Sequence, residues 1–271
     1  MVRNNLCESL VAISSAKGSF GYPAEPPFRP DVCYPEIHHL RTGSEKNVTY
    51  ELVRQVFFNL GMDSARFGTP EWNPLGEIIQ PGQTVLIKPN WVRHIHMGGG
   101  DINIVITHGS IVRCVLDYVA KALDGKGKIV VGDAPIQSAD FQKILLLAGM
   151  TDICDEIEGQ WGMPVNIEDF RLVTIKLGRN RSVKEKFERA ENRSNYIAVN
   201  LGKYSLLDGL SDHPERFRVT SYDCGEMIKH HNRQTHEYLI PKAVLDADVV
   251  INLPKLKTHR KAGMTSALKN L

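Results

Sequence analysis

Three short apolar segments of the sequence each run into a group of polar side chains. Residues 84–87, 128–131 and 248–253 form the apolar segments, and the polar residues that close or follow them are Lys88, Asn90, Asp133, Asn252, Lys255, Lys257, Thr258 and His259. A continuous apolar run suits a strand that is buried on both faces, as in a parallel sheet. Because ligands of such sheets bind beyond the carboxyl ends of the strands, we expect these polar side chains to face one crevice.

The lysines of this group predict an anionic ligand. Lys88, Lys255 and Lys257 would neutralise a phosphate or a carboxylate. A helix is expected just after His108, and its N-terminal amides and dipole would favour the same charge. The predicted ligand-binding residues are Lys88, Asn90, Thr107, His108, Asn252, Lys257 and Thr258. Lysines in strand-to-helix loops are often only solvated, so the prediction depends on their convergence.

Asp133, Lys255 and His259 are the candidates for catalysis. Asp133 at a strand tip could hold a metal, bind a ribose or act as a base, and an Asx turn is the structural alternative. Lys255 follows Pro254 and could clamp a phosphate or serve as a base or Schiff-base nucleophile. His259 adds a proton carrier nearby. The sequence does not choose among these roles.

A metal site is a second hypothesis for the same region. His94 and His96 form an H-x-H pair, and alternate residues of an extended backbone point to one side. They could share a divalent metal that Asp133, His108 or His259 would complete, although such loop histidines are often only surface polar groups. Neither G-x-G-x-x-G, the P-loop motif nor G-x-S-x-G occurs in the sequence, so no other cofactor or nucleophile is predicted.

Composition limits the class of protein. Five scattered cysteines (Cys7, Cys33, Cys114, Cys154 and Cys224) form no C-x-x-C, which disfavours disulfide, structural zinc and iron–sulfur sites. The chain carries 33 basic and 31 acidic residues for a net charge of +2, so charge predicts neither nucleic acid nor membrane as a partner. No apolar run approaches the roughly 20 residues of a membrane span. We therefore expect a cytoplasmic protein.

The elements that would position these residues alternate between strand and helix. A helix is predicted after Asn47, which can cap it, and ends at Gly61. Further helices are predicted over residues 111–123, with Ser110 as cap, and over 139–148. An early strand is predicted at 10–13. The spacing is that of parallel crossover units. We expect an α/β fold with a mainly parallel β-sheet flanked by helices.

The pattern weakens between residues 151 and 238. Strands are expected at 165–170, 172–177 and 197–199, and the charged stretch 180–195 is expected to be a solvated helix or loop. We predict a single α/β domain over residues 1–271, with an insertion or cap at about 151–240, between the third and last core strands. Residues 263–271 look like the start of a helix, and because the pattern stops there we expect a natural C-terminal part to be missing.

Four motifs support a family resemblance. They are VLIKPNWV (85–92), the Thr107–His108 pair before a helix, IVVGDAP (129–135) and VINLPKLKTHRKAGMTSALKNL (250–271). Over residues 85–271 the sequence resembles the family known as domain of unknown function 362. The family's recurrent polar positions correspond to Lys88, Asn90, Thr107, His108, Asp133, Asn252, Lys255, Lys257, Thr258, His259, Lys269 and Asn270.

The resemblance implies no established activity. Many members are soluble prokaryotic proteins, some carry ferredoxin-type cysteine clusters fused C-terminally, and members usually continue past the final K-N motif. From the residues we expect an enzyme that acts on a small phosphorylated or carboxylate metabolite, with a divalent metal as a sub-hypothesis. The alternatives are a non-catalytic ligand-binding or electron-transfer accessory protein with a ferredoxin-like partner, and an inactive gene fragment.

Overall fold

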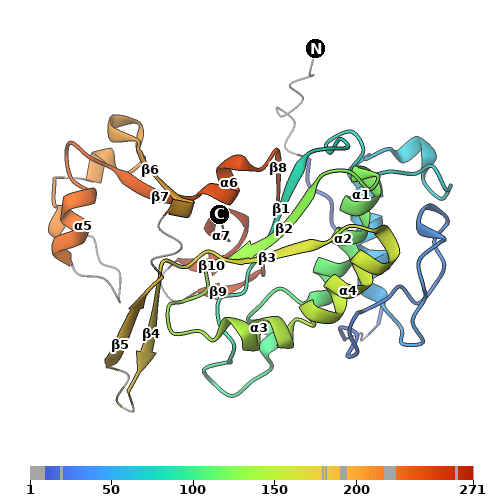
Figure 1. Cartoon of the computed structure of the whole chain (residues 1–271), viewed down its shortest axis with the longest axis horizontal. Helices are drawn as coiled ribbons and strands as arrows, with labels where there is room; N and C mark the ends of the chain where they lie inside the picture. Colours follow the sequence, from blue (N-terminus) through green and yellow to red (C-terminus); the bar gives the residue numbers. More distant parts are fainter. Residues whose placement is uncertain are drawn as a thin grey trace. The chain divides into compact units, whose positions relative to one another are not determined.

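The computed structural model divides the chain into two compact units. The first unit is Met1–Phe187 together with Ala247–Leu271, and the second is Glu188–Asp246 (Figure 1). The structure describes residues 10–18, 21–178, 180, 182–189, 194–210, 212–216, 224–259 and 262–270. Cys7 lies outside these residues. All predicted site residues fall in the first unit, so the first unit holds the region of interest.

A four-stranded parallel sheet forms the centre of the first unit. Its strand order is β3-β2-β1-β8, with bounds Val165–Asp169, Lys128–Asp133, Thr84–Pro89 and Val249–Leu253 (Figure 1). Lys88 is in register with Asn252, and Asp133 with Asp169. The predicted parallel α/β fold is confirmed. All four strands point the same way, so their polar carboxyl ends share one edge of the sheet.

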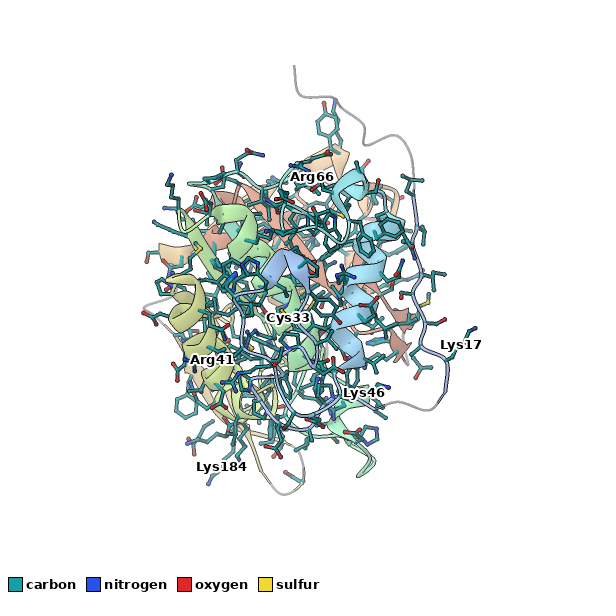
Figure 2. All side chains as sticks on the ribbon, turned by 90° about the vertical axis from the view of Figure 1, so that its right-hand side faces the viewer. Lys17, Cys33, Arg41, Lys46, Arg66 and Lys184 are labelled. Carbon is teal, nitrogen blue, oxygen red and sulfur yellow. The ribbon has the colours of Figure 1, made fainter. Side chains whose placement is uncertain are left out.

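Helices α1 (Val48–Asn59), α2 (Gly109–Leu123), α3 (Phe141–Leu147) and α4 (Met150–Trp161) pack around this sheet. Helix α2 contacts β1, α4 contacts β3, and α1 packs on α2. Figure 2 faces these helices and shows the segment around Cys33 crossing them. Residues Val112, Val119 and Leu123 of α2 are fully buried, which is the pattern of a helix covered on most sides.

The predicted helix caps are corrected at two positions. Asn47 precedes α1, but its side-chain amide donates to the carbonyls of Phe28 and Arg29 instead of capping the helix. The cap of α2 is His108, whose Nδ1 accepts from the Ser110 amide at 3.1 Å. At Asn47 a tertiary contact competes for the side chain that local sequence would assign to a cap, whereas α2 begins at Gly109, so Ser110 already lies inside the helix.

Three other predictions of elements were wrong. Residues 10–13 form no strand and are largely exposed, because no neighbouring strand pairs with them. Within the charged stretch, Val183–Glu188 forms strand β5, which pairs with β4 (Val173–Leu177). The helix expected over residues 263–271 is present only as the short helix α7 (Ala267–Asn270), and Gly263–Thr265 forms strand β10, antiparallel to β9 (Lys257–His259).

The second unit is small and is built around one antiparallel strand pair. Strands β6 (Tyr196–Asn200) and β7 (Glu237–Pro241) pair antiparallel, with helices α5 (Cys224–His230) and α6 (Lys242–Asp246) beside them in the chain. The insertion had been predicted to begin at about residue 151. Helix α4 and β3 instead belong to the first unit, since β3 pairs with β2, and the second unit begins at Glu188.

Buried ion pairs join the helices of the first unit. Arg113 and Asp117 are fully buried and lie 2.8 Å apart, and Asp117 also accepts from the Tyr50 hydroxyl and, at 2.7 Å, from the Trp161 indole. A second pair joins Arg54 to Glu36 at 2.6 Å. Because each charge has a partner of opposite sign, this helical network is closed within the protein.

Within the described residues, no helix combines the length and apolarity needed to cross a bilayer.

Candidate functional site

An ion pair between neighbouring strands lies at the carboxyl edge of the sheet. Lys88 Nζ of β1 lies 2.7 Å from Asp133 Oδ1 of β2, with side chains 14% and 7% exposed. The second oxygen of Asp133 accepts from the Trp91 backbone amide at 2.6 Å. Both carboxylate oxygens are thus engaged, so Asp133 holds Lys88 and the start of the loop after β1 in place.

A second set of hydrogen bonds ties the loop after β1 to β8. The Asn90 amide donates to Thr107 Oγ1 at 2.9 Å, and the Thr107 amide donates to the Asn90 carbonyl at 3.0 Å. Thr107 Oγ1 then donates to the Leu253 carbonyl at 2.6 Å. A threonine hydroxyl can accept and donate at once, which explains why one residue joins two strand ends.

Lys257 reaches this region from the short strand β9. Its Nζ donates to Asn90 Oδ1 at 3.4 Å and to the Val105 carbonyl. Burial, followed by repulsion from Lys269, lowers the pKa of Lys257 to about 8 against the attraction of Asp133. We call Lys88, Asn90, Thr107, Asp133 and Lys257 the strand-end cluster.

More positive charge surrounds Lys257. Lys255 and Arg93 also act on it and lower its pKa, after the larger effects of burial and Lys269. Asp133 is the carboxylate that acts on Lys257, and it is already paired with Lys88. The positive charges that act on Lys257 therefore outnumber the negative ones. A half-buried lysine among like charges favours either loss of its own proton or the arrival of an anion.

His108 and Lys255 are linked through Tyr22. The rings of Tyr22 and His108 are stacked with centroids 4.3 Å apart, and Lys255 Nζ donates to the Tyr22 hydroxyl at 3.2 Å. Burial, followed by repulsion from Lys255, lowers the pKa of His108 to about 4. The imidazole is therefore neutral at pH 7 and acts as a hydrogen-bond acceptor at the start of α2.

Helix α2 can begin beside this region only because residue 109 is glycine. A Cβ at Gly109 would lie 2.0 Å from the Ala148 carbonyl oxygen. Backbone atoms of another segment cannot move aside as a flexible side chain can. Close packing of the chain before α4 therefore requires the glycine that follows His108.

Two asparagines connect the end of the chain to the sheet. Asn270 Nδ2 donates to Asn252 Oδ1 at 2.7 Å and to the Lys88 carbonyl at 3.2 Å. Asn252 Nδ2 donates in turn to the Ala267 carbonyl at 2.9 Å. Asn252 was predicted to bind ligand, but both ends of its amide are used to fasten α7 across β1 and β8.

Two predicted site residues, Thr258 and His259, lie on strand β9 and are not part of the hydrogen bonds described above for the strand-end cluster. His259 Nδ1 accepts from the Ala262 amide at 3.0 Å, so this ring nitrogen is used beside the start of β10. Thr258 is exposed, and alternation along β9 directs it to the face opposite Lys257. Sequence adjacency to Lys257 therefore did not bring Thr258 to the same face.

The structure does not assemble the predicted metal ligands. His94 Nδ1 accepts from the Asp140 amide at 2.9 Å, and His96 Nδ1 accepts from the Gly100 amide at 2.7 Å. Asp133 is bound to Lys88 and Trp91 instead. Among the described residues no group of three histidine, cysteine or carboxylate side chains is placed to hold a metal ion.

Sequence reasoning missed three residues near the cluster. Arg93 is in the loop after β1, Tyr22 is in a proline- and glycine-rich segment, and Thr265 is in register with Lys257. The Thr265 hydroxyl is buried without a hydrogen-bond partner among the described residues. Arg93 could have been found from its place five residues after Lys88, whereas no sequence signal marked Tyr22 or Thr265.

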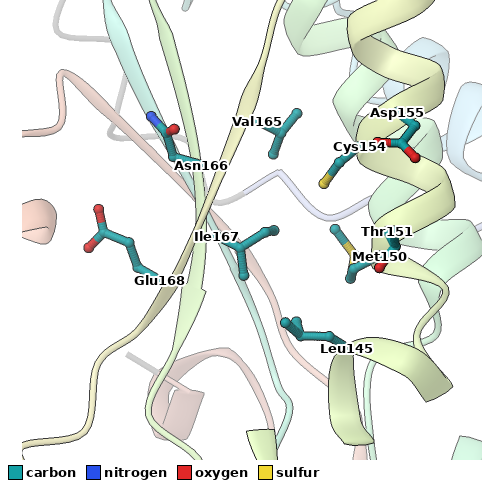
Figure 3. Close-up of a pocket in the computed structure, with 9 residues that line it drawn as sticks. All are labelled: Leu145, Met150, Thr151, Cys154, Asp155, Val165, Asn166, Ile167 and Glu168. Carbon is teal, nitrogen blue, oxygen red and sulfur yellow. The ribbon is translucent and has the colours of Figure 1, made fainter. Parts of the chain in front are cut away.

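A separate cavity of about 570 Å³ lies between α4 and β3. Figure 3 shows Val165 and Ile167 pointing toward Cys154 and Met150, while Asn166 points away. Burial raises the pKa of the Cys154 thiol to about 11, so the thiolate is scarce at neutral pH. The cavity contains none of the predicted site residues, and the cluster is not part of it.

Comparison with known proteins assigns the chain to a family. The model of the family described as Domain of unknown function (DUF362) matches residues 85–197 and 207–271, so the chain belongs to this family. Over 75 residues it is 40% identical to the thylakoid-associated protein sll1697 of Synechocystis sp., a match that covers 28% of this chain and 22% of that relative. No solved structure matches the chain significantly.

Proposed function

We propose that the strand-end cluster binds a small anion, a phosphate or carboxylate metabolite, and that the protein is an enzyme acting on it in the cytoplasm. One observation carries the proposal. The half-buried Lys257 is repelled electrostatically by Lys269, Lys255 and Arg93, while Asp133 is already paired with Lys88. An anion near Lys257 would offset this surplus of positive charge. Such charge-assisted contacts are among the stronger polar interactions in proteins.

Within this proposal the roles of the residues follow from their contacts. Asp133 fixes Lys88 and the loop after β1, and Asn90 orients Lys257. Lys257 is the proton-transfer group, because a pKa of about 8 leaves both of its protonation states populated near neutral pH. Lys255 neutralises ligand charge beside Tyr22. This assigns proton transfer to Lys257 rather than to Lys255 or His259.

The buried Thr265 hydroxyl supports a polar ligand at the same place. Thr265 lies opposite Lys257 across the β9–β10 pair, and directly opposed residues of such a pair lie on one face. In the described part of the chain its oxygen has no hydrogen-bond partner. A buried hydroxyl without a partner is unfavourable, and a small shift on binding could supply one.

Isothermal titration calorimetry at pH 7 with inorganic phosphate, citrate and a nucleoside diphosphate tests the proposal. We expect one of these anions to bind and Lys257→Met to weaken its binding by about tenfold or more, equal to about 1.4 kcal/mol. The matched control is Lys128→Met, which changes an exposed lysine at the opposite end of β2 and should leave binding unchanged. Absence of binding by all three anions, or equal affinity in Lys257→Met, would refute the proposal.

The pH dependence of binding gives a second test. A bound anion favours protonated Lys257, whose pKa in the free protein is about 8. The affinity should therefore fall as the pH rises from 7 to 9, and a fall of similar size should be absent in Lys257→Met.

A further inference from the structure

A cavity of about 780 Å³ opens beside the strand-end cluster in the first unit. One wall is the loop after β1, with Arg93, Ile95 and Met97; a second wall includes Ile136. A third wall is β4, through Ile175 and Leu177. The volume lies within the range of about 300–1,000 Å³ that is usual for small-molecule pockets.

Two segments of the cavity lining follow cluster residues closely in the chain. The Trp91 amide is bound to Asp133, and Arg93 follows two residues later. On the other side, Ile136 follows Asp133 by three residues, and its amide donates to the Val92 carbonyl at 3.0 Å. The hydrogen bond between Ile136 and Val92 joins the two walls of the cavity. Both walls lie within a few residues of the Lys88–Asp133 pair along the chain.

The lining combines apolar side chains with positive charge. Ile95, Met97, Ile136 and Leu177 are large apolar residues with exposed fractions between 36% and 54%, and all four line this one cavity. Grouped exposed apolar side chains mark binding surfaces more often than scattered ones. Arg93 lies in the lining and also acts electrostatically on Lys257, so positive charge extends from the cavity to the cluster.

The carboxylate and the imidazole of the cavity lining, those of Asp140 and His94, accept hydrogen bonds from backbone amides. The Asp140 carboxylate caps α3 by accepting from the Lys143 amide at 3.1 Å. His94 Nδ1 accepts from the Asp140 amide at 2.9 Å. These contacts hold His94 and Asp140 in place between the loop after β1 and α3, and Arg93 is the cation of the same lining that also acts on Lys257.

We propose that this cavity holds the apolar part of an amphipathic anion whose phosphate or carboxylate is bound at the strand-end cluster. The ligand class is a monomeric amphiphile, with an alkyl, prenyl or aromatic group attached to the anion. The inference rests on the proposed anion-binding function and deepens it. It accounts for the adjacency of an exposed apolar lining and a cationic cluster, which a small hydrophilic anion alone would leave unexplained.

Calorimetric titration of the full chain with matched pairs of ligands tests the inference. The pairs are methyl phosphate with octyl phosphate, and acetate with octanoate, all below their critical micelle concentrations; octanol serves as the uncharged comparison. We expect the longer member of the bound pair to bind about tenfold tighter or better, because burial of alkyl groups from water is favourable. Octanol should bind more weakly than the charged amphiphile.

Variants separate the two parts of the site. Ile136→Ser and, independently, Met97→Ser should reduce the advantage of the longer ligand by about threefold or more while the short anion binds as before. Lys257→Met should weaken the short and the long anion alike. Ile78→Ser changes an exposed isoleucine that is outside the cavity lining and should alter neither affinity. Thermal unfolding of each variant confirms that it folds.

The outcomes distinguish this inference from the proposed function. Equal affinity for short and long anions would overturn the inference and leave the anion site intact. Binding of octanol as tight as that of octyl phosphate would overturn it as well, since the anion would then have no part. Binding to phosphatidylglycerol vesicles without binding of any monomeric amphiphile would also overturn it. Failure of every anion to bind would refute the proposed function itself.

Discussion

The helical network and the strand-end cluster both bury charged side chains, but they balance those charges differently. In the helical network Arg113 is paired with Asp117 and Arg54 with Glu36, and tyrosine and tryptophan donors complete the contacts. In the strand-end cluster only Lys88 has a carboxylate partner, while Lys257 meets further cations. The charges of the first region are balanced within the protein, whereas we propose that a ligand of opposite charge balances those of the second.

This difference gives a criterion for separating scaffold from site. A buried charge with a complete set of partners contributes to a specific packing, and its removal is costly because the partner is left alone. A partly buried charge without such partners already destabilises the folded state, so its removal should cost little. The two regions should therefore respond in opposite ways to loss of a charged residue.

The largest expected effect is in the helical network. Asp117→Ala would leave Arg113 buried without its carboxylate and would remove the acceptor of Tyr50 and Trp161. We expect a loss of about 3–5 kcal/mol in the free energy of unfolding. Urea denaturation at pH 7 measures it, with the exposed Glu158→Ala change in α4 as control. A loss no larger than that of the control would show that the network is not required.

The next largest effect is a rise in the free energy of unfolding at alkaline pH, caused by Lys257. Its pKa is about 8 in the folded protein and near 10.5 in the unfolded chain. Between these values the unfolded state binds more protons, so the free energy of unfolding should rise with pH from 8 to 10.5. Lys257→Met should lack this rise. Urea denaturation across that range measures the difference, and parallel pH curves for the two proteins would contradict the assignment.

The smallest expected effect is that of His108 at acid pH. Its pKa is about 4 in the folded protein and 6.5 in the unfolded chain, so stability should fall as the pH falls from 6.5 to 4. His108→Asn keeps an acceptor for the Ser110 amide at the start of α2 and should remove this part of the acid loss. Thermal unfolding between pH 4 and 7 measures it. If His108→Asn lost as much stability between pH 6.5 and 4 as the unchanged protein, His108 would be protonated in the folded state.

The core strands and three helices were predictable because their patterns follow from local physical requirements. Residues 85–87 and 129–131 are continuous apolar runs, and a strand covered on both faces requires such a run. Residues 249–251 form a similar run, but β8 lies at the sheet edge and Val250 is exposed, so the expectation that this strand is buried on both faces was wrong. The apolar stripe of α2 follows the 3.6-residue period in the same way. Strand β5 escaped prediction because it pairs with β4 at a charged surface, where little apolar pattern is needed.

The candidate site was predictable only in part. The ends of β1, β2 and β8 indicated Lys88, Asp133 and the lysines after residue 253, and the parallel sheet brings those ends to one edge. The choice of Lys257 over Lys255 depended on a hairpin that places one lysine against Asn90 and the other against Tyr22. Both lysines have the same side chain, so composition could not distinguish them.

The sequence alone determined where strands end, which polar residues follow them, and the family to which these motifs belong. Those properties depend on neighbours within a few residues, where periodicity and chain stiffness act. The tertiary structure decided which charges are balanced, which lysine loses its hydration, and which apolar side chains line a shared cavity. Burial and electrostatic interaction depend on atoms far apart in the chain, and only the folded arrangement brings those atoms together.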